Sequence, residues 1–104
     1  MTGLLLTVLL GDALAADAAA GKSIYMTNCM SCHGANADGN GPAAMALQPA
    51  PTDFTDPGFW AGKSEADIKS AIRSGRPGTS MMGFSQLSQE DVNNITAFLS
   101  SKKP

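Results

Sequence analysis

Two cysteines and the only histidine of this 104-residue chain lie within five consecutive residues, Cys29-Met30-Ser31-Cys32-His33. Positions three apart share a face of a helical turn, so both thiols can reach the two vinyl groups along one edge of a porphyrin and form thioether bonds. His33 then lies under the iron and can ligate it through a ring nitrogen. The spacing Cys-x-x-Cys-His is therefore typical of covalent attachment of a c-type haem.

Three other interpretations of the two cysteines are weaker. A thioredoxin-like redox pair requires a βαβ setting, and no segment of the chain shows the period-two alternation of a strand. A zinc site requires about four protein ligands, which two Cys and one His do not supply. A disulfide between Cys29 and Cys32 would close so short a loop that it would stabilise the fold little.

A haem iron held by His33 needs a ligand on its other side, and no second histidine exists in the chain. The remaining candidate is a methionine on a downstream loop, where Met81 and Met82 are adjacent. Met26 and Met30 lie in or beside the attachment segment. The order of histidine site, long loop, helix, methionine loop and final helix favours a ligand role for the Met81-Met82 pair over a role as core filler.

The attachment segment is expected to form a helix from Ala18 to His33. The evidence is a stripe of small, aromatic and sulfur-bearing side chains at spacings of four, four and three: Gly21, Tyr25, Cys29 and Cys32. From Gly34 to Pro57, frequent glycine and proline predict a long loop, with one helical turn at residues 43–47. A loop this long needs a reason in a compact domain, and wrapping a bound cofactor supplies one.

Two further helices have stronger signals. Ser64 with Asp67 three residues later resembles a capping box, and Gly75 ends that segment. Ser88 with Asp91 begins the last helix in the same way. The apolar faces of the two helices are formed by Ile68, Ala71 and Ile72, and by Val92, Ile95, Phe98 and Leu99. The predicted fold class is all-α.

The amino terminus has the pattern of an export signal. Residues 4–10 form an apolar run of the length of a signal-peptide core, far short of a membrane span, and the small-x-small site Ala13-Leu14-Ala15 follows. No Lys or Arg precedes the run. We interpret residues 1–15 as a signal peptide or its remnant and residues 16–104 as one monohaem domain; an apolar helical tail packed on the domain is the alternative.

Composition excludes several classes of protein. Seven Lys plus Arg against nine Asp plus Glu, with 6% aromatic residues, give neither the basic patch nor the stacking surface of a nucleic-acid binder. Two cysteines are too few for a disulfide framework, and one histidine excludes a bis-histidine haem within this chain. A chain this short has a marginal apolar core, which a bound haem would complete.

From Ala18 to its C-terminus the chain resembles the class I c-type cytochromes, specifically the small soluble bacterial monohaem members. Gly21-x-x-x-Tyr25 followed by the haem motif and Gly34 is similar to the first helix of that family, and Phe98 stands at the aromatic position that packs across it. The resemblance implies the cytochrome c fold, in which the terminal helices pack together while loops and a third helix wrap one haem c held through Cys29 and Cys32.

The resemblance also implies roles for individual residues. Gly75-Arg76-Pro77-Gly78-Thr79, leading into Ser80-Met81-Met82-Gly83-Phe84, is similar to the ligand loop of the family, usually Met-Pro-x-Phe, which assigns the axial ligand to Met81. Met82 stands where proline is common, and relatives that read Met-x-Phe would select Met82. In Gly41-Pro42 the Pro42 carbonyl would accept a hydrogen bond from the free nitrogen of the haem histidine. The Trp60 indole would donate to a haem propionate or, as a core aromatic, to another polar partner.

Iron ligated by His33 and a methionine has no open position for a substrate. A thioether ligand and an apolar pocket both favour the ferrous state. The expected walls of the pocket are Ile24, Leu47, Phe54, Phe84, Leu87, Ile95 and Leu99. The expected function is one-electron transfer between periplasmic or membrane redox proteins, by a monomeric, exported bacterial carrier that is not an enzyme.

The alternative is a haem enzyme or a gas or redox sensor whose distal methionine is weak or displaceable. Arg73 and Arg76, which precede the methionine loop, keep that alternative open because a distal Arg could act on a bound ligand. The basic residues form no dense cluster in the sequence. We therefore expect a weak, partly apolar contact with redox partners, with Met45, Leu47 and Met82 as candidates.

Overall fold

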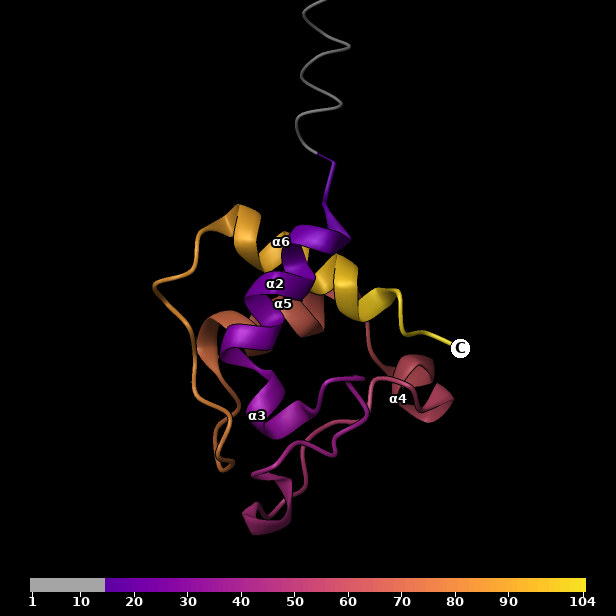
Figure 1. Ribbon diagram of the computed structural model, residues 1–104, viewed down its shortest axis with the longest axis vertical. Helices are drawn as coiled ribbons and strands as arrows, with labels where there is room; N and C mark the ends of the chain where they lie inside the picture. The colour runs from indigo at the N-terminus through magenta and orange to yellow at the C-terminus, as the bar shows by residue number, and fades with distance from the viewer. Residues whose placement is uncertain (1–14) are drawn as a thin grey trace, which may run out of the picture.

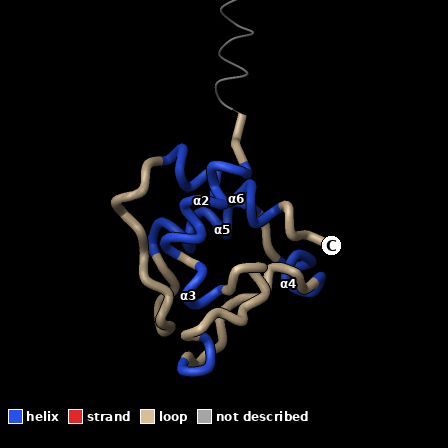
Figure 2. The backbone as a smooth tube through the Cα atoms, viewed as in Figure 1, coloured by secondary structure: helices blue, strands red, loops and turns tan. Residues whose placement is uncertain are grey.

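The computed structural model describes residues 15–104, so residues 1–14 of the expected signal peptide lie outside the described residues. Helices and loops make up the described chain, and none of its residues is in a strand (Figure 2). The helices, in chain order, are α2 (Ala18–Asn28), α3 (Met30–His33), the short 3₁₀ turn η1 (Ala44–Ala46), α4 (Pro57–Gly62), α5 (Glu65–Ser74) and α6 (Gln89–Ser100). The all-α prediction is confirmed.

The two terminal helices, α2 and α6, cross one another at the centre of the fold, with α5 beside them (Figure 1). Gly21 makes the close crossing possible, because a Cβ atom at this position would collide with the backbone carbonyl of Asn94. One turn further on, the Tyr25 ring packs on Phe98, with 5.0 Å between the ring centroids. The expected contact of Phe98 with the first helix is thus observed.

The attachment segment is not the single helix that its spacing predicts. α2 ends at Asn28 and α3 begins at Met30, with Cys29 between them in a non-helical conformation (φ −122°, ψ −26°). Backbone bonds nevertheless bridge the junction, from the Cys29 N–H to Tyr25 O at 2.7 Å and from the His33 N–H to Cys29 O at 2.9 Å. The chain therefore bends at Cys29 while its hydrogen bonding continues to His33.

Both helices predicted from capping boxes are present. In α5 the Ser64 side chain accepts from the Asp67 N–H while the Asp67 carboxylate accepts from the Ser64 N–H. Ser88 and Asp91 repeat this exchange at the start of α6. Each box satisfies two backbone donors that a helix N-terminus otherwise leaves unpaired, which fixes where these helices begin.

The long loop between α3 and α5 contains one helix that the sequence analysis did not predict. α4 begins at Pro57, and the side chain of Asp56 caps it by accepting from the Gly58 N–H at 2.9 Å. An Asp N-cap followed by Pro at the first helical position is a recognised signal for the start of a helix, so α4 could have been predicted from the sequence. The helical turn expected at residues 43–47 is observed as η1.

No helix in the described part of the chain is both long enough and apolar enough to span a membrane.

Candidate functional site

A cavity of about 380 Å³ opens between the attachment helices, the loop around Thr52, helix α5 and the loop before α6. Five of the seven expected wall residues line it: Leu47, Phe54, Phe84, Ile95 and Leu99. Ile24 and Leu87 do not, and instead pack against the buried core from outside the cavity. Ile68 and Ile72 of α5 complete the apolar walls. The cavity thus extends the hydrophobic core.

Both cysteines line this cavity and neither forms a disulfide. Burial, with a smaller contribution from the neighbouring Cys32, raises the pKa of the Cys29 thiol to about 11. A redox-active Cys-x-x-Cys pair requires the opposite, a lowered pKa that supplies a thiolate nucleophile. The environment of Cys29 therefore disfavours a thioredoxin-like role.

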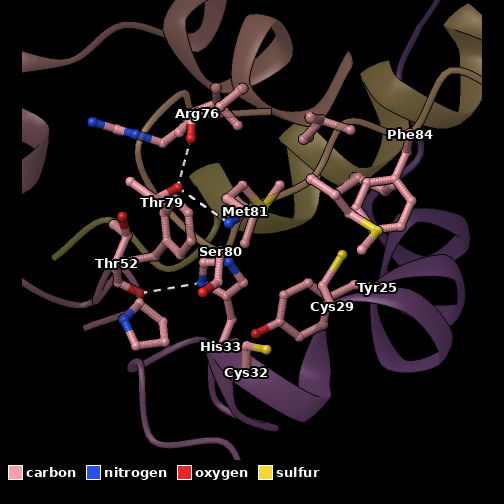
Figure 3. Close-up of a pocket in the computed structure, with 18 of the residues that line it drawn as sticks. Tyr25, Cys29, Cys32, His33, Thr52, Arg76, Thr79, Ser80, Met81 and Phe84 are labelled. Atoms are coloured by element: carbon pink, nitrogen blue, oxygen red, sulfur yellow. Dashed lines mark hydrogen bonds between the residues drawn. The ribbon is translucent and has the colours of Figure 1, made fainter. Parts of the chain in front are cut away.

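The imidazole of His33 lies in the same cavity, with its Nδ1 3.4 Å from the carbonyl oxygen of Thr52 (Figure 3). Burial lowers the pKa of His33, and the hydrogen bond to Thr52 opposes that shift. The neutral ring is the form that can bind a metal. In the tautomer that carries its proton on Nδ1, the ring donates to Thr52 and leaves the Nε2 lone pair for an iron atom.

The carbonyl expected beside His33, that of Pro42, is not the one that the structure places there. The carbonyl that meets His33 Nδ1 belongs to Thr52, and Pro42 does not line the cavity. The physical reason is the path of the loop: the Phe54 N–H donates to Ala37 O at 2.8 Å and draws the segment with Thr52 back against the histidine. A backbone carbonyl is offered by every residue, so no side-chain pattern could have identified Thr52.

The two candidate methionines both line the cavity but differ in exposure. Met81 is half-buried, whereas Met82 is 68% exposed. In the close-up, the His33 side chain rises from α3 towards the loop that carries Met81 (Figure 3). The structure therefore brings Met81 and His33 to one cavity from two separate parts of the chain.

The backbone of Met81 is held on both of its sides. Its N–H donates to Thr79 Oγ1 at 3.1 Å, and its carbonyl accepts from the Arg76 N–H at 3.0 Å. Thr79 Oγ1 in turn donates to Arg76 O at 2.7 Å (Figure 3). Thr79 was not among the residues expected at the site, although threonine side chains in turns are a known source of such side-chain to backbone bonds.

Trp60 has the second of its two expected roles. Its indole N–H donates to the Phe54 carbonyl at 2.7 Å, and its ring packs edge-on against Phe59 at 5.1 Å between centroids. Trp60 does not line the cavity, because α4 turns it onto this aromatic group, where Lys103 Nζ lies 5.0 Å from the ring centroid. In this geometry its N–H is already engaged, so donation to a haem propionate is not supported.

The donor set fits a haem better than a metal ion alone. Within residues 15–104 no group of three or more His, Cys, Asp and Glu side chains could hold a metal ion. The cavity instead combines two free thiols, one neutral imidazole and one thioether with apolar walls, as a porphyrin with covalent and axial attachments requires. His33, Met81 and Met82 are the imidazole- and thioether-bearing side chains that line this cavity.

Among curated proteins, the chain is similar to cytochrome c-554(547) of Halothiobacillus neapolitanus, with 33% identity over 93 residues that cover 86% of this chain and 100% of that protein. It is also 33% identical over 85 residues to the Cbb3-type cytochrome c oxidase subunit FixP of Bradyrhizobium sp. (strain ORS 278). That match covers 82% of this chain and only 27% of FixP, so the likeness to FixP concerns part of that subunit.

Three solved structures share the fold. The Kuenenia stuttgartiensis reducing HAO-like protein complex Kustc0457/Kustc0458 matches with a TM-score of 0.70 and 25% identity over 81% of this chain and 41% of that one. Dihydro-heme d1 dehydrogenase NirN matches with a TM-score of 0.61 and 27% identity over 77% of this chain and 15% of that one. The KustC0563 c-type cytochrome matches with a TM-score of 0.65 and 24% identity over 81% and 98% of the two chains.

The family model that matches is that of cytochrome c, and the match spans residues 18–103, nearly all of the described chain. With the haem motif at the cavity and the all-helical fold around it, this match establishes that the chain belongs to the cytochrome c family.

Proposed function

We propose that this cytochrome c is a one-electron carrier whose haem c is bound through Cys29 and Cys32, with His33 and Met81 as the two axial ligands of the iron. The family accounts for covalent haem and electron transfer. The observation that carries the ligand assignment is that His33 and Met81 approach a single cavity from α3 and from the loop before α6. We further propose that the protein acts as an exported, periplasmic monomer.

Met81 is favoured over Met82 by its surroundings. A metal ligand must stay in one place, and both backbone polar groups of Met81 are hydrogen-bonded while its side chain is half-buried. Met82 projects more of its side chain into solvent, with 68% exposed. We assign to Met82 the edge of the cavity, where it would contact a partner.

Each group at the site then has a defined task. The haem supplies an iron that exchanges one electron between its ferrous and ferric states. His33, oriented by the Thr52 carbonyl, and Met81, oriented by Thr79, would occupy both axial positions and exclude substrates. The apolar walls disfavour the extra charge of the ferric state and so raise the reduction potential.

The partners would be other redox proteins, met through a small apolar contact. Met45 is fully exposed and Met82 largely so, and both are flexible side chains suited to a transient surface. Electron transfer with the natural partner should therefore change little with added salt. A steep fall with salt would instead indicate docking through charge.

The ligand assignment is tested by two matched variants, Met81→Ala and Met82→Ala. Wild-type ferric protein should show the weak far-red absorption band of methionine sulfur on haem iron. We expect Met81→Ala to lose the band and Met82→Ala to keep it. Loss of the band in Met82→Ala alone would transfer the ligand role to Met82.

Carbon monoxide separates the carrier from an enzyme or sensor with an open site. A ferrous carrier with Met81 bound should react slowly with carbon monoxide, whereas Met81→Ala should react rapidly. Rapid binding by the wild type, or a high-spin spectrum, would contradict the carrier function and support a displaceable methionine.

A further inference from the structure

Arg73 makes the most concentrated set of side-chain hydrogen bonds in the described chain. It lies in the last turn of α5, half-buried, and the two hydrogens of its Nη1 are shared among the carbonyl oxygens of Phe84 at 3.2 Å, Ser85 at 3.3 Å and Leu87 at 2.5 Å. All three acceptors belong to the segment between Met81 and helix α6. One guanidinium therefore attaches that segment to α5.

The methionine loop is bound to the end of α5 by its backbone as well. The Phe84 N–H donates to Ile72 O at 2.8 Å, and the Arg76 N–H donates to Met81 O at 3.0 Å. The backbone of the methionine loop lies so close to the end of α5 that a Cβ atom at Gly75 would be 2.7 Å from Met81 O, and one at Gly83 would be 2.7 Å from Arg73 O. The position of Met81 is thus determined relative to α5.

Thr79 secures the segment before Met81, and Arg73 secures the segment after it. The Thr79 hydroxyl forms hydrogen bonds within a single turn, whereas the Arg73 side chain connects helix α5 to the loop before α6. Hydrogen bonds from a charged donor are stronger than neutral ones, and a planar guanidinium holds several acceptors in a fixed geometry. Of the side-chain hydrogen bonds around Met81, those of Arg73 therefore attach the loop to another element, and their loss would leave only its backbone bonds to the end of α5.

We propose that Arg73 is a positioning residue for the axial ligand: it holds the Met81 thioether over the haem iron by fixing residues 84–87 to α5. This rests on the proposed ligation by His33 and Met81. Thioether sulfur is a soft ligand that binds ferric iron weakly, so restraint by the protein decides how long it stays bound. From its sequence position Arg73 was expected only as a distal group, but its side chain points to backbone carbonyls after Met81 and it does not line the cavity.

The test compares Arg73→Ala and Arg73→Lys with Lys69→Gln, all in the holoprotein. Lys69 is on the same helix and its removal costs the same charge, without any of the three carbonyl bonds. The rate at which imidazole displaces the methionine from ferric protein reports opening of the loop. We expect displacement on the order of tenfold faster in Arg73→Ala, an intermediate rate in Arg73→Lys, and the wild-type rate in Lys69→Gln.

An alkaline titration gives an independent measurement. As pH rises, harder nitrogen or oxygen ligands compete for ferric iron and the far-red methionine band is lost. A tenfold weaker methionine bond moves the midpoint of this loss down by about one pH unit when one proton is released. We expect this downward shift in Arg73→Ala and no shift in Lys69→Gln.

A double variant distinguishes positioning of Met81 from general loosening of the fold. In a Met81→Ala background no methionine has to leave, so imidazole should bind equally fast with Arg73 or with Ala at position 73. Acceleration of the same size in that background would overturn the proposal. Wild-type rates and midpoints in Arg73→Ala and Arg73→Lys would also overturn it, while leaving the His33 and Met81 ligation intact. Absence of the far-red band from the wild type would overturn both.

Discussion

The hydroxyl group of Tyr25 donates a 2.5 Å hydrogen bond to the carbonyl oxygen of Gly34, the residue that follows His33. Tyr25 is 1% exposed, and burial raises the pKa of its hydroxyl, which therefore remains a donor. Its ring also packs on Phe98. A single side chain thus links the crossing of the terminal helices to the end of the attachment segment.

Replacing Tyr25 with Phe should lower the free energy of unfolding by about 1 kcal/mol, because the ring packing stays while one buried hydrogen bond is lost. Urea unfolding of the holoprotein measures the change. Thr27→Ala is the control, since it removes an exposed hydroxyl from the same helix. Equal midpoints for Tyr25→Phe and the wild type would show that the bond to Gly34 contributes nothing.

A substitution at the crossing of α2 and α6 should lower the free energy of unfolding more than the loss of the Tyr25 hydroxyl does. In Gly21→Ala the added methyl group meets the backbone of Asn94, which cannot move aside without separating the helices. We expect a loss of about 1–3 kcal/mol in the free energy of unfolding, the usual range for overpacking. The matched control is Gly62→Ala in α4, where a Cβ would meet nothing within 4 Å. If both variants unfold at the wild-type urea concentration, the close crossing is not required.

The elements that could be predicted from the sequence are those encoded by local side-chain chemistry. The capping boxes of α5 and α6 place their signal within four residues, Ser64 to Asp67 and Ser88 to Asp91, and both helices begin there. The haem motif is equally local. From the order of the elements it could also be predicted that the Met81-Met82 pair lies near the motif, and both methionines line the cavity that contains it.

What could not be predicted depends on backbone groups brought together by the fold. The partner of His33 is a carbonyl of Thr52, and the partner of Trp60 is a carbonyl of Phe54. Neither acceptor has a sequence signature, so the resemblance pointed to Pro42 in place of Thr52, and the polar partner of Trp60 stayed unnamed. The hydrogen-bond acceptors of Arg73 are also backbone carbonyls, which have no sequence signature. The bend at Cys29 was also missed, because the spacing of four, four and three fits one straight helix.

The capping box of α5 should give the stability of the protein a specific dependence on acid. The Ser64 backbone N–H and then its hydroxyl lower the pKa of the exposed Asp67 carboxyl. A lowered carboxyl pKa in the folded state stabilises the fold above the unfolded value of about 3.9, and this contribution disappears as pH falls through the folded value. The free energy of unfolding of wild type should therefore exceed that of Asp67→Asn at neutral pH, and the difference should shrink as pH falls below about 4.

Glu90→Gln is the comparison for that titration, because Glu90 is an exposed acid in the first turn of α6 and is not one of the two residues of its capping box. Urea unfolding at several pH values between neutrality and acid gives the difference in free energy of unfolding between wild type and each of the two variants. A gap between wild type and Asp67→Asn that stays constant across this range would contradict the role of the ionised carboxylate.

Haem attachment should decide whether the chain folds at all. The cavity of about 380 Å³ is walled by core residues, among them Ile72 and Ile95. At about 24 cal/mol per Å³, an enclosed void of that volume would cost about 9 kcal/mol, comparable with the whole stability of a small domain, about 5–15 kcal/mol; a cavity open to water costs less than this upper bound. Without the cofactor, water would enter the space or the walls would collapse into it, and we expect either to weaken the packing of the core residues that line it.

A variant with both Cys29→Ala and Cys32→Ala, prepared free of haem, should therefore have far less helix than the holoprotein by far-ultraviolet circular dichroism and no cooperative urea transition. The control is Cys29→Ala alone, in which one thioether bond and the proposed ligands His33 and Met81 should still hold the haem. Because that variant keeps the cavity filled, it should remain folded with a modestly lower midpoint. A haem-free double variant that unfolds cooperatively at the holoprotein midpoint would show that the polypeptide core is sufficient without its cofactor.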